Sequence, residues 1–484
     1  MANQLVDIEK MTSEIKEALL QRQLRKAEEL AIFLLKEHPL LTQAWLSLGE
    51  ALYHQGYKGA AKEVFKRAIL LDPQAAWIKT IEPIINEINV ESERKDINDL
   101  LEVPRKTVAA AILVKNEERC IKRCIDSIIK AVDEVVVIDT GSTDKTLDIV
   151  SSYKDIKLLH FEWCDDFAAA RNFGLDHIES DWVLWIDADE YLHQDDVANV
   201  KLVAGIFDSI EPVPILRVGQ FNFMGNSLSI NYDQSRMFPL RRGLKYFGRV
   251  HEQIRPQNGK PNDRFSAAVQ IRLLHDGYDS RVMNDKRKLE RNISLLKKMI
   301  SEEPDIPSWW LFLGRETLAT GNIDEAINIL LEAEKRALVT PWFGRSPEIY
   351  VNLIRAYIIK DELDLAEQVC YRAIKKDPDF HYLLGCIKIK QAVKLYKEAE
   401  KHLNDSKQLF SSYRGIVSPD NRIAEYKADL AIADISRLTG NLASAKMVFD
   451  SVLSKYPELN GPKTQLEIIE NQRNLLNALS AQSN

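Results

Sequence analysis

The sequence has few cysteines and no excess of basic charge, and both absences narrow what the chain can do. Only five of its 484 residues are cysteine, too few for a disulfide scaffold, so we expect a reducing, cytoplasmic location. Lys and Arg number 65 against 72 Asp and Glu, which leaves a net charge of −7. A broad nucleic-acid surface needs net or clustered basic charge, so we expect no nucleic-acid partner.

Long apolar segments are also missing. No apolar run reaches the roughly 20 residues that a membrane helix needs, so we expect no membrane span. The first residues, MANQLVDIEKMTSE, contain no basic stretch followed by an apolar one, and we expect no secretion signal. Hydrophobic residues nevertheless make up 45% of the chain, enough to bury a core. The length predicts about three folded units.

Helical repeats are predicted at both ends of the chain. Between residues 42 and 73, large residues, glycines, small alanines and a final proline recur at the spacing of a tetratricopeptide repeat of about 34 residues. The residues are Trp45, Leu48, Gly49, Gly56, Ala61, Phe65, Ala68 and Pro73. The pattern returns from Pro307 onward as Trp310, Leu313, Gly314, Gly321, Ala326 and Ala333, followed by a third copy and a weaker fourth. We therefore expect tetratricopeptide-like helices in residues 1–90 and a tetratricopeptide-like array in residues 281–484; ordinary amphipathic helices are the alternative.

The N-terminal region holds only about one and a half copies of the pattern, whereas solenoids generally need about three. Its apolar face, with Trp45, Leu48 and Leu52, should therefore pack on another part of the chain or on a second copy. The second possibility predicts a homo-oligomer formed through the helical repeats.

Between the two arrays the hydrophobic pattern is typical of a parallel α/β sheet. A charged segment, 91–104, is expected to be a linker, and apolar runs of strand length then alternate with helix-like segments. The expected strands are 107–114, 134–138, 156–161 and 182–186. Ligands of such sheets bind beyond the carboxyl ends of the strands, so the residues that follow each strand are the candidate site.

Three of these strand ends carry acidic side chains. Asn116 and Glu117 follow the first strand, Asp139 ends the second, and Asp187 and Asp189 follow the fourth. Carboxylates on one rim repel one another unless a cation or polar ligand lies among them. Two aspartates two residues apart would point the same way and offer oxygen ligands to Mg²⁺ or Mn²⁺.

Four ordered motifs of this region resemble those of family 2 glycosyltransferases with the GT-A fold. They read ILVKNEE, VVVIDTGSTDKT, DDFAAARNFG and WVLWIDADE, within residues 105–280. The segment SRMFPLRRGLKYFGRVHEQI with LLHDGY resembles lipopolysaccharide-core glucosyltransferases and sublancin-type peptide S-glycosyltransferases. The resemblance implies a Rossmann-like α/β GT-A catalytic domain in residues 105–280, flanked by all-α tetratricopeptide-type repeats. The second subgroup also continues into such helices after its catalytic domain, whereas the additional N-terminal repeat departs from both.

The resemblance also implies roles for individual residues. The expected donor contacts are Asn116, Glu117, Asp139, Arg171 and Asp187, with Asp139 accepting from the uracil N3–H. The expected ligands of Mg²⁺ or Mn²⁺ are Asp189, Asp187 and His275, and the expected catalytic pair is Glu252, as the acceptor's base, with His251. The donor is expected to be a UDP-sugar, UDP-glucose first, although no residue distinguishes glucose from galactose or N-acetylglucosamine.

The chemistry of sugar transfer needs both an ion and a base, and the expected site residues supply both. The ion would stabilise the departing diphosphate and the base would take the acceptor's proton on the opposite face, which inverts the anomeric centre. Our leading hypothesis is an inverting, metal-dependent transferase that moves a hexose to a Cys, Ser or Thr side chain of a peptide or protein. A saccharide or lipid-linked acceptor of the cell envelope is one alternative. A tetratricopeptide scaffold with an inactive transferase domain is another.

Individual residues have simpler explanations too. Asp139 precedes Gly-Ser and could have no role beyond forming a turn. His275 could have no role beyond a hydrogen bond to the backbone at a strand end. The pair His251–Glu252 could lie in an ordinary exposed loop. Cys120 and Cys124 share a helix face, but no second pair at ligand spacing completes a metal site, so we expect core thiols.

Overall fold

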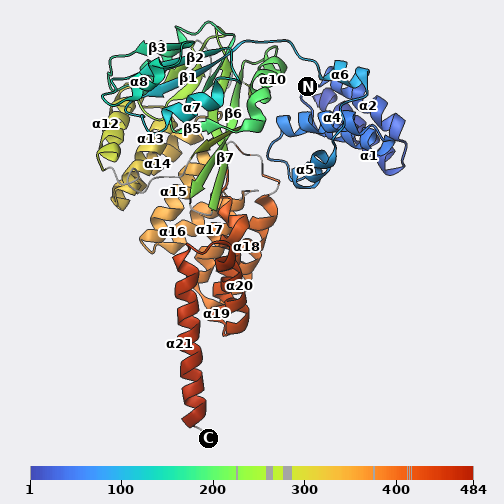
Figure 1. Ribbon diagram of the computed structural model, residues 1–484. Helices are drawn as coiled ribbons and strands as arrows, with labels where there is room; N and C mark the ends of the chain where they lie inside the picture. The colour runs from blue at the N-terminus through green and yellow to red at the C-terminus, as the bar shows by residue number, and fades with distance from the viewer. Residues whose placement is uncertain are drawn as a thin grey trace.

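The computed structural model describes residues 2–224, 227–257, 265–275, 286–373, 377–410, 412–413, 415 and 417–482. These residues form an N-terminal helical array, a central α/β domain and a C-terminal helical array (Figure 1). In this view the N-terminal array lies to the right of the α/β domain, and the C-terminal array extends downwards from it. The expected domain boundary between residues 280 and 281 falls outside the described residues.

Paired helices build the N-terminal array, as the repeat pattern predicts. The helices are α1 (Ala2–Leu20), α2 (Leu24–Glu37), α3 (Thr42–Gln55), α4 (Lys58–Leu71) and α5 (Ile78–Glu87). A side chain on Gly49 of α3 would place its Cβ 2.4 Å from the ring of Phe65 on α4, so this helix crossing requires glycine. Trp45, Leu48 and Leu52 are buried in the array's own core. The open apolar face from which we expected a homo-oligomer is therefore filled within the array.

The expected linker contains a short helix, α6 (Lys95–Leu101), which packs on the N-terminal array. Ile97 is fully buried in the core of the array, and Arg94 forms an ion pair with Glu28 at 2.5 Å. On the other side, Leu70 of α4 belongs to the main hydrophobic core of the α/β domain. The N-terminal array is thus joined to the domain by packing as well as by the chain.

The four strands predicted from apolar runs form the parallel half of an eight-stranded sheet. They are β3 (Ile156–His160), β2 (Glu134–Asp139), β1 (Val108–Val114) and β4 (Trp182–Trp185), in that spatial order. β1, β2 and β4 are almost continuously apolar and buried, whereas β3, at the edge of the sheet, is only half-buried. Their carboxyl ends meet at one edge, as the sequence predicts.

Four more strands extend the sheet beyond β4, and the sequence pattern did not predict them. In spatial order they are β7 (Ser227–Pro239), β6 (Pro214–Met224), β10 (Phe265–His275) and β5 (Glu190–Leu192). β7 runs antiparallel to β4, and β5 runs antiparallel to β10. The last pairing sets His275 opposite Glu190, one residue after Asp189. A separate hairpin consists of β8 (Leu244–Phe247) and β9 (Gln253–Pro256).

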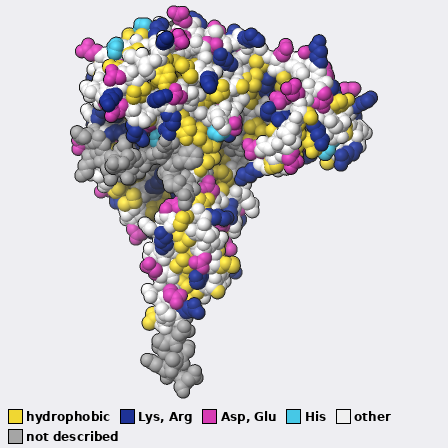
Figure 2. All heavy atoms as spheres, viewed as in Figure 1, with side chains coloured by type: hydrophobic (Ala, Val, Ile, Leu, Met, Phe, Trp, Pro, Cys, Tyr) yellow, Lys and Arg dark blue, Asp and Glu magenta, His cyan; other side chains and the backbone are white. Residues whose placement is uncertain are grey.

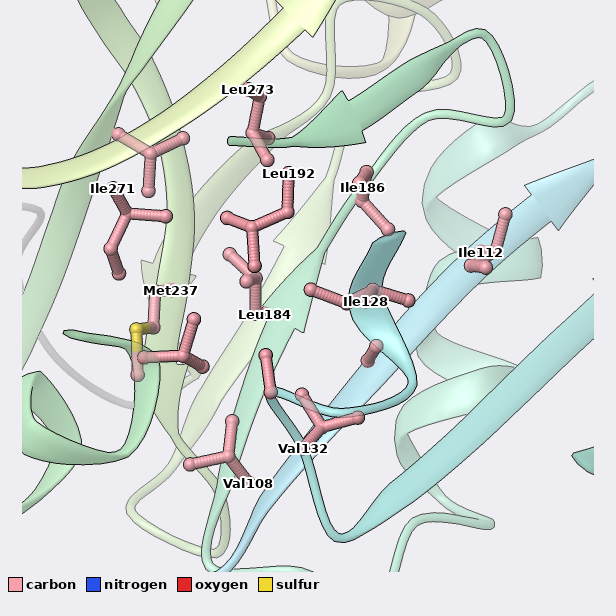
Figure 3. Close-up of a cluster of buried hydrophobic side chains, with 14 of the residues drawn as sticks. Val108, Ile112, Ile128, Val132, Leu184, Ile186, Leu192, Met237, Ile271 and Leu273 are labelled. Carbon is pink, nitrogen blue, oxygen red and sulfur yellow. The ribbon is translucent and has the colours of Figure 1, made fainter. Parts of the chain in front are cut away.

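Alternate side chains of the central strands enter two separate cores. Val108 and Ile112 of β1 lie in one cluster with Leu184 of β4, whereas Ala109 and Ala111 lie in a second cluster on the other face. Figure 3 shows the first cluster, where side chains from the strands meet Ile128 of α7 and Val132, which follows that helix. The domain's helices are α7 (Ile121–Ile128), α8 (Thr146–Ser151), α9 (Phe167–Leu175) and α10 (Val197–Phe207).

The C-terminal array stacks helices from residue 286 onward. They are α12 (Lys286–Glu302), α13 (Pro307–Ala319), α14 (Ile323–Leu338), α15 (Ser346–Ile359), α16 (Leu363–Ala373), α17 (Pro378–Gln391), α18 (Tyr396–Phe410), α19 (Ala428–Leu438), α20 (Leu442–Lys455) and α21 (Asn460–Gln482). Val250, from the segment between β8 and β9, is buried in the core of this array. Gly248 has a φ of 99°, and a Cβ there would lie 2.7 Å from the ring of Trp309 on α13. The array therefore meets the α/β domain beside residues 251 and 252.

The helices, the surface charges and the cysteines can be compared with what the composition led us to expect. Within the described residues, no helix is both long and apolar enough to cross a bilayer. Figure 2 shows acidic and basic side chains interspersed over the viewed face. All five cysteines are free thiols, and Cys120 and Cys124 are buried, as the core-thiol interpretation predicts.

Candidate active site

The loops that follow β1 and β2 form one rim because they bond to each other. The Thr143 N–H donates to Oδ1 of Asn116 at 2.7 Å, and the Asn116 N–H donates to the Ser142 hydroxyl at 3.0 Å. The Glu117 N–H donates to the Thr146 hydroxyl at 2.7 Å. Asn116 has a φ of 59°, a left-handed conformation that asparagine tolerates better than most residues. Its side chain therefore positions the rim.

Asp139 ends β2 and is buried inside its own turn. Its two carboxylate oxygens accept from the Gly141 and Ser142 N–H groups, each at 3.0 Å. Burial alone would raise the pKa of Asp139, but hydrogen bonds from Ser142 and Gly141 outweigh it and hold the pKa below its ordinary value. The turn-forming interpretation of Asp139 is thus part of the structure, and it keeps a negative charge at the base of the rim.

Asp189 and His275 meet at the carboxyl edge of the sheet. Nε2 of His275 lies 3.0 Å from Oδ2 of Asp189, whose side chain is 44% exposed. The hydrogen bond to Asp189 raises the pKa of His275 against the opposing effect of burial. Burial, together with the nearby charge of Asp189, raises the pKa of Glu117 despite the bond from Cys120. Asp189 thus raises the pKa of both His275 and Glu117, which shows that the three side chains lie near one another on the rim.

Asp189 and His275 offer a carboxylate oxygen and an imidazole nitrogen, which lie 3.0 Å apart in a hydrogen bond, as candidate ligands for a divalent ion. Mg²⁺ commonly takes one or two protein ligands and completes its shell with water and substrate phosphates. Asp189 and His275 could hold the ion in this way.

Asp187 is bound by two arginines. Arg236 of β7 donates to both of its carboxylate oxygens, at 2.9 and 2.5 Å, and Arg171 of α9 approaches Oδ1 at 3.4 Å. Burial would raise the pKa of Asp187, but the charges of Arg236 and Arg171 hold it well below its ordinary value. In this arrangement Asp187 organises the two arginines, and Asp189 is the carboxylate that the rim leaves open to an ion.

Arg236 is a site residue that we did not predict from sequence. It is 7% exposed and also lies 3.5 Å from Glu190, whose pKa is raised by burial. The signal in the sequence is an arginine between serine and the apolar residues Met237 and Phe238, since a charge in a buried strand needs an opposite charge.

Glu252 faces the same network. The Arg171 Nε–H donates to Oε1 of Glu252 at 2.6 Å, and the Glu252 side chain is 14% exposed. The Arg171 guanidinium lies over the rings of Trp185 and Tyr246, at 4.6 and 5.4 Å from their centroids. Burial alone would lower the pKa of Arg171, but the charges of Glu252 and Asp187 outweigh burial and raise the pKa above its ordinary value. This arginine therefore remains charged.

His251 turns away from Glu252 and toward the C-terminal array. Its Nε2 lies 2.8 Å from Oε1 of Glu316 on α13, and its ring packs against Phe312 at 4.8 Å between centroids. The backbone at His251 is left-handed, with a φ of 53°. The structure thus brings Glu252 to the donor rim, whereas His251 belongs to the contact with the array.

A cavity of about 410 Å³ opens between the α/β domain and the array. Glu252 and His251 line it on one side, and Phe312, Trp342 and Phe343 of the array line the other. Its charged lining also includes Asp233, Arg217, Arg255, Arg315 and Arg345. A substrate in this cavity would touch both the candidate base and the helical repeats.

Known families match all three parts of the chain. Residues 110–203 match the family model "Glycosyl transferase family 2", and residues 13–76 and 304–379 match "Tetratricopeptide repeat". The SPbeta prophage-derived glycosyltransferase SunS of Bacillus subtilis is 34% identical, over 46% of this chain and 52% of its own length. A TPR repeat-containing protein of Synechococcus elongatus is 27% identical over 57% of this chain and 68% of its own.

The lipopolysaccharide core biosynthesis glycosyltransferase LpsC of Rhizobium meliloti is 28% identical over 40% of this chain and 72% of its own length. The predicted resemblance and fold class are therefore confirmed: an α/β domain that matches the family 2 glycosyltransferase model over residues 110–203 lies between tetratricopeptide-type arrays. The chain spans about half the length of SunS.

Proposed function

We propose that this chain is an inverting, metal-dependent glycosyltransferase that moves a hexose from a UDP-sugar to a Cys, Ser or Thr side chain of a peptide or protein. The arrangement that carries the proposal is the placement of Glu252 beside the donor rim. Arg171 bridges Glu252 to Asp187, at 2.6 and 3.4 Å, and Asp189 with His275 lies two residues further along the rim. A candidate base and a candidate ion site thus belong to one bonded network.

The rim would bind the donor through the residues that the resemblance implies. Asp139 would accept from the uracil N3–H, and Glu117 would lie beside the uridine. Asp187 would face the ribose while Arg236 holds it in place. Asp189 and His275 would hold Mg²⁺ or Mn²⁺, which when bound supplies a Lewis acid for the departing diphosphate. UDP-glucose is the donor we expect first.

Glu252 would act on the acceptor. As the acceptor oxygen or sulfur forms a bond to the anomeric carbon, the bond from that carbon to the diphosphate oxygen breaks. The acceptor's proton passes to the Glu252 carboxylate, which Arg171 orients through its 2.6 Å bond. A single displacement of this kind inverts the anomeric centre.

A peptide or protein acceptor would reach Glu252 through the cavity shared with the C-terminal array. Stacked repeats present extended grooves to such ligands, and the aromatic lining from Phe312 to Phe343 could hold an apolar side chain. The likeness to LpsC keeps a saccharide acceptor as the second candidate. With five free thiols, the protein suits the reducing cytoplasm.

Donor turnover is the first test. The purified protein should bind UDP in calorimetry with Mn²⁺ and should slowly hydrolyse a UDP-hexose, and both signals should disappear with chelator. Panels of UDP-glucose, UDP-galactose and UDP-N-acetylglucosamine would identify the sugar. Peptide and saccharide acceptors, compared by mass spectrometry, would separate the two candidate functions. If the protein shows no UDP binding and no hydrolysis, the result would favour a scaffold with an inactive domain.

A further inference from the structure

Two histidines and an aspartate converge in the C-terminal array, outside the network described above. His381 lies on α17, and His402 and Asp405 lie on the neighbouring helix α18. The last two are three residues apart and therefore share a face of their helix. Nδ1 of His381 lies 3.2 Å from Nδ1 of His402 and 3.9 Å from Oδ2 of Asp405, and all three candidate ligand atoms lie within 4.8 Å of one another.

We propose that His381, His402 and Asp405 form a site for a divalent transition-metal ion of the Zn²⁺ type, with water as the fourth ligand. Zn²⁺ bonds of 2.0–2.1 Å to nitrogen in a tetrahedral site separate the two ligands by about 3.3 Å. The two Nδ1 atoms are already at 3.2 Å. Oδ2 of Asp405, at 3.9 Å from Nδ1 of His381, would move closer to reach the same geometry.

The surroundings favour the metal-binding form of the histidines. The side chains of His381 and His402 are 14% and 15% exposed, whereas that of Asp405 is 34% exposed and leaves the site open to solvent on its side. Two Nδ1 atoms at this distance cannot both carry hydrogen.

A further carboxylate lies behind the site. Oε1 of Glu398 is 3.9 Å from Nε2 of His402, the nitrogen that faces away from His381. Metal-bound histidines commonly direct their second ring nitrogen at a carboxylate, which orients the ring. The charge of Lys401 opposes a cation here, but this side chain is exposed. Glu398 also pairs with Lys388 at 3.6 Å, so Asp405 supplies the negative charge on the open side of the site.

Ligand type separates this site from the donor rim. Imidazole nitrogens favour Zn²⁺, Co²⁺ and Ni²⁺, whereas the rim pairs one carboxylate with one imidazole and suits Mg²⁺ or Mn²⁺ completed by phosphate. An ion between α17 and α18 would tie two consecutive helices of the array together. It would therefore stabilise the array, because it binds the folded helices only.

The test uses the full chain without an affinity tag, stripped with chelator and titrated with Co²⁺ as a spectroscopic probe. We expect a visible absorption band that saturates at one ion per chain and is displaced by Zn²⁺. His402→Ala and Asp405→Asn should each weaken Co²⁺ binding about tenfold or more. His54→Ala, at an exposed histidine of the N-terminal array, is the matched control and should bind as the wild type does.

Asp189→Ala separates this site from the donor rim and should leave the Co²⁺ band unchanged. Zn²⁺ should also raise the thermal midpoint of the wild type but not of Asp405→Asn, a partly exposed position where folding is not at risk. The proposal is overturned if Co²⁺ and Zn²⁺ bind the wild type no better than Asp405→Asn. It is also overturned if Asp189→Ala abolishes the band.

Discussion

Arg171 donates its Nε–H to Oε1 of Glu252 at 2.6 Å while its Nη2 approaches Oδ1 of Asp187 at 3.4 Å. One guanidinium therefore spans the distance between the donor rim and the segment that leads into β9. The rings of Trp185 and Tyr246 lie beneath it and restrict its movement. Because its partners lie on both sides, the position of the candidate base depends on the donor rim.

Asp189→Ala should reduce sugar transfer by at least about 100-fold and abolish metal-dependent UDP binding, because it removes the open carboxylate of the rim. The fold should be preserved, since the side chain is 44% exposed. Calorimetry with UDP and Mn²⁺ and a transfer assay measure the two effects, and circular dichroism checks the fold. Asp155→Ala, at an exposed aspartate after α8, is the control. Full activity of Asp189→Ala would exclude this carboxylate as a ligand.

Glu252→Gln should reduce transfer about 10²- to 10⁴-fold and change donor binding little, because the amide still accepts from Arg171 but takes no proton. His251→Gln is the matched control, since His251 faces Glu316, and its effect should be much smaller. An acceptor thiol, with a pKa of about 8.5, is partly ionised without help. With such an acceptor the defect of Glu252→Gln should shrink as the pH rises toward that value. Equal losses in both variants would argue against Glu252 as the base.

Asp379 should make stability depend on pH. Burial, with the charges of Asp377 and Asp420, outweighs the hydrogen bond from the Asp420 N–H and raises the pKa of Asp379 to about 7. The unfolded chain loses this proton near pH 3.9, so the folded state alone keeps it between about pH 4 and 7. The free energy of unfolding should therefore fall as pH rises through this window.

Asp379→Asn should flatten that dependence and stabilise the protein at pH 8, because the amide oxygen can keep the bond from the Asp420 N–H. Urea unfolding at pH 5 and pH 8 measures the difference, which should be a few kcal/mol at most. An unchanged slope in Asp379→Asn would show that other groups cause the dependence.

Leu70→Ala should destabilise the α/β domain although the residue belongs to the N-terminal array. Leu70 is 2% exposed and lies in the main core of the domain, so a cavity there should cost about 2–5 kcal/mol. Leu20→Ala, at a leucine that is 76% exposed, is the control and should cost little. UDP binding, measured as the denaturant concentration rises, reports on the unfolding of the α/β domain itself. If UDP binding survives to the same denaturant concentration in Leu70→Ala, the array and the domain unfold independently.

The sequence predicted the parallel half of the sheet because β1, β2 and β4 are buried and therefore form nearly continuous apolar runs. β6 and β7 were missed because they mix apolar residues with polar ones such as Gln220 and Arg236, whose partners come from distant segments. Strand-end positions were enough to place Asp139, Asp187 and Asp189 on one rim. The engagement of Asp187 by Arg236 was not predictable, since the two residues meet only through the pairing of β4 with β7.

The pair at 251 and 252 shows a second limit of sequence patterns. Adjacent residues were expected to act together, but His251 pairs with Glu316 and Glu252 pairs with Arg171. Both partners come from helices far away in the sequence, so no local pattern indicates them. Only the three-dimensional structure separates the two roles.

The burial of Val250 in the core of the C-terminal array limits how this protein can be taken apart or recombined. Val250 lies two residues before Glu252, so the loop that carries the candidate base is held by the helices of the array. An enzyme engineer who exchanged the array for that of a relative would alter both the acceptor surface and the alignment of the base. Such an exchange should keep transfer only if residues 248–255 travel with the array, because this segment and Trp309 on α13 pack as one unit.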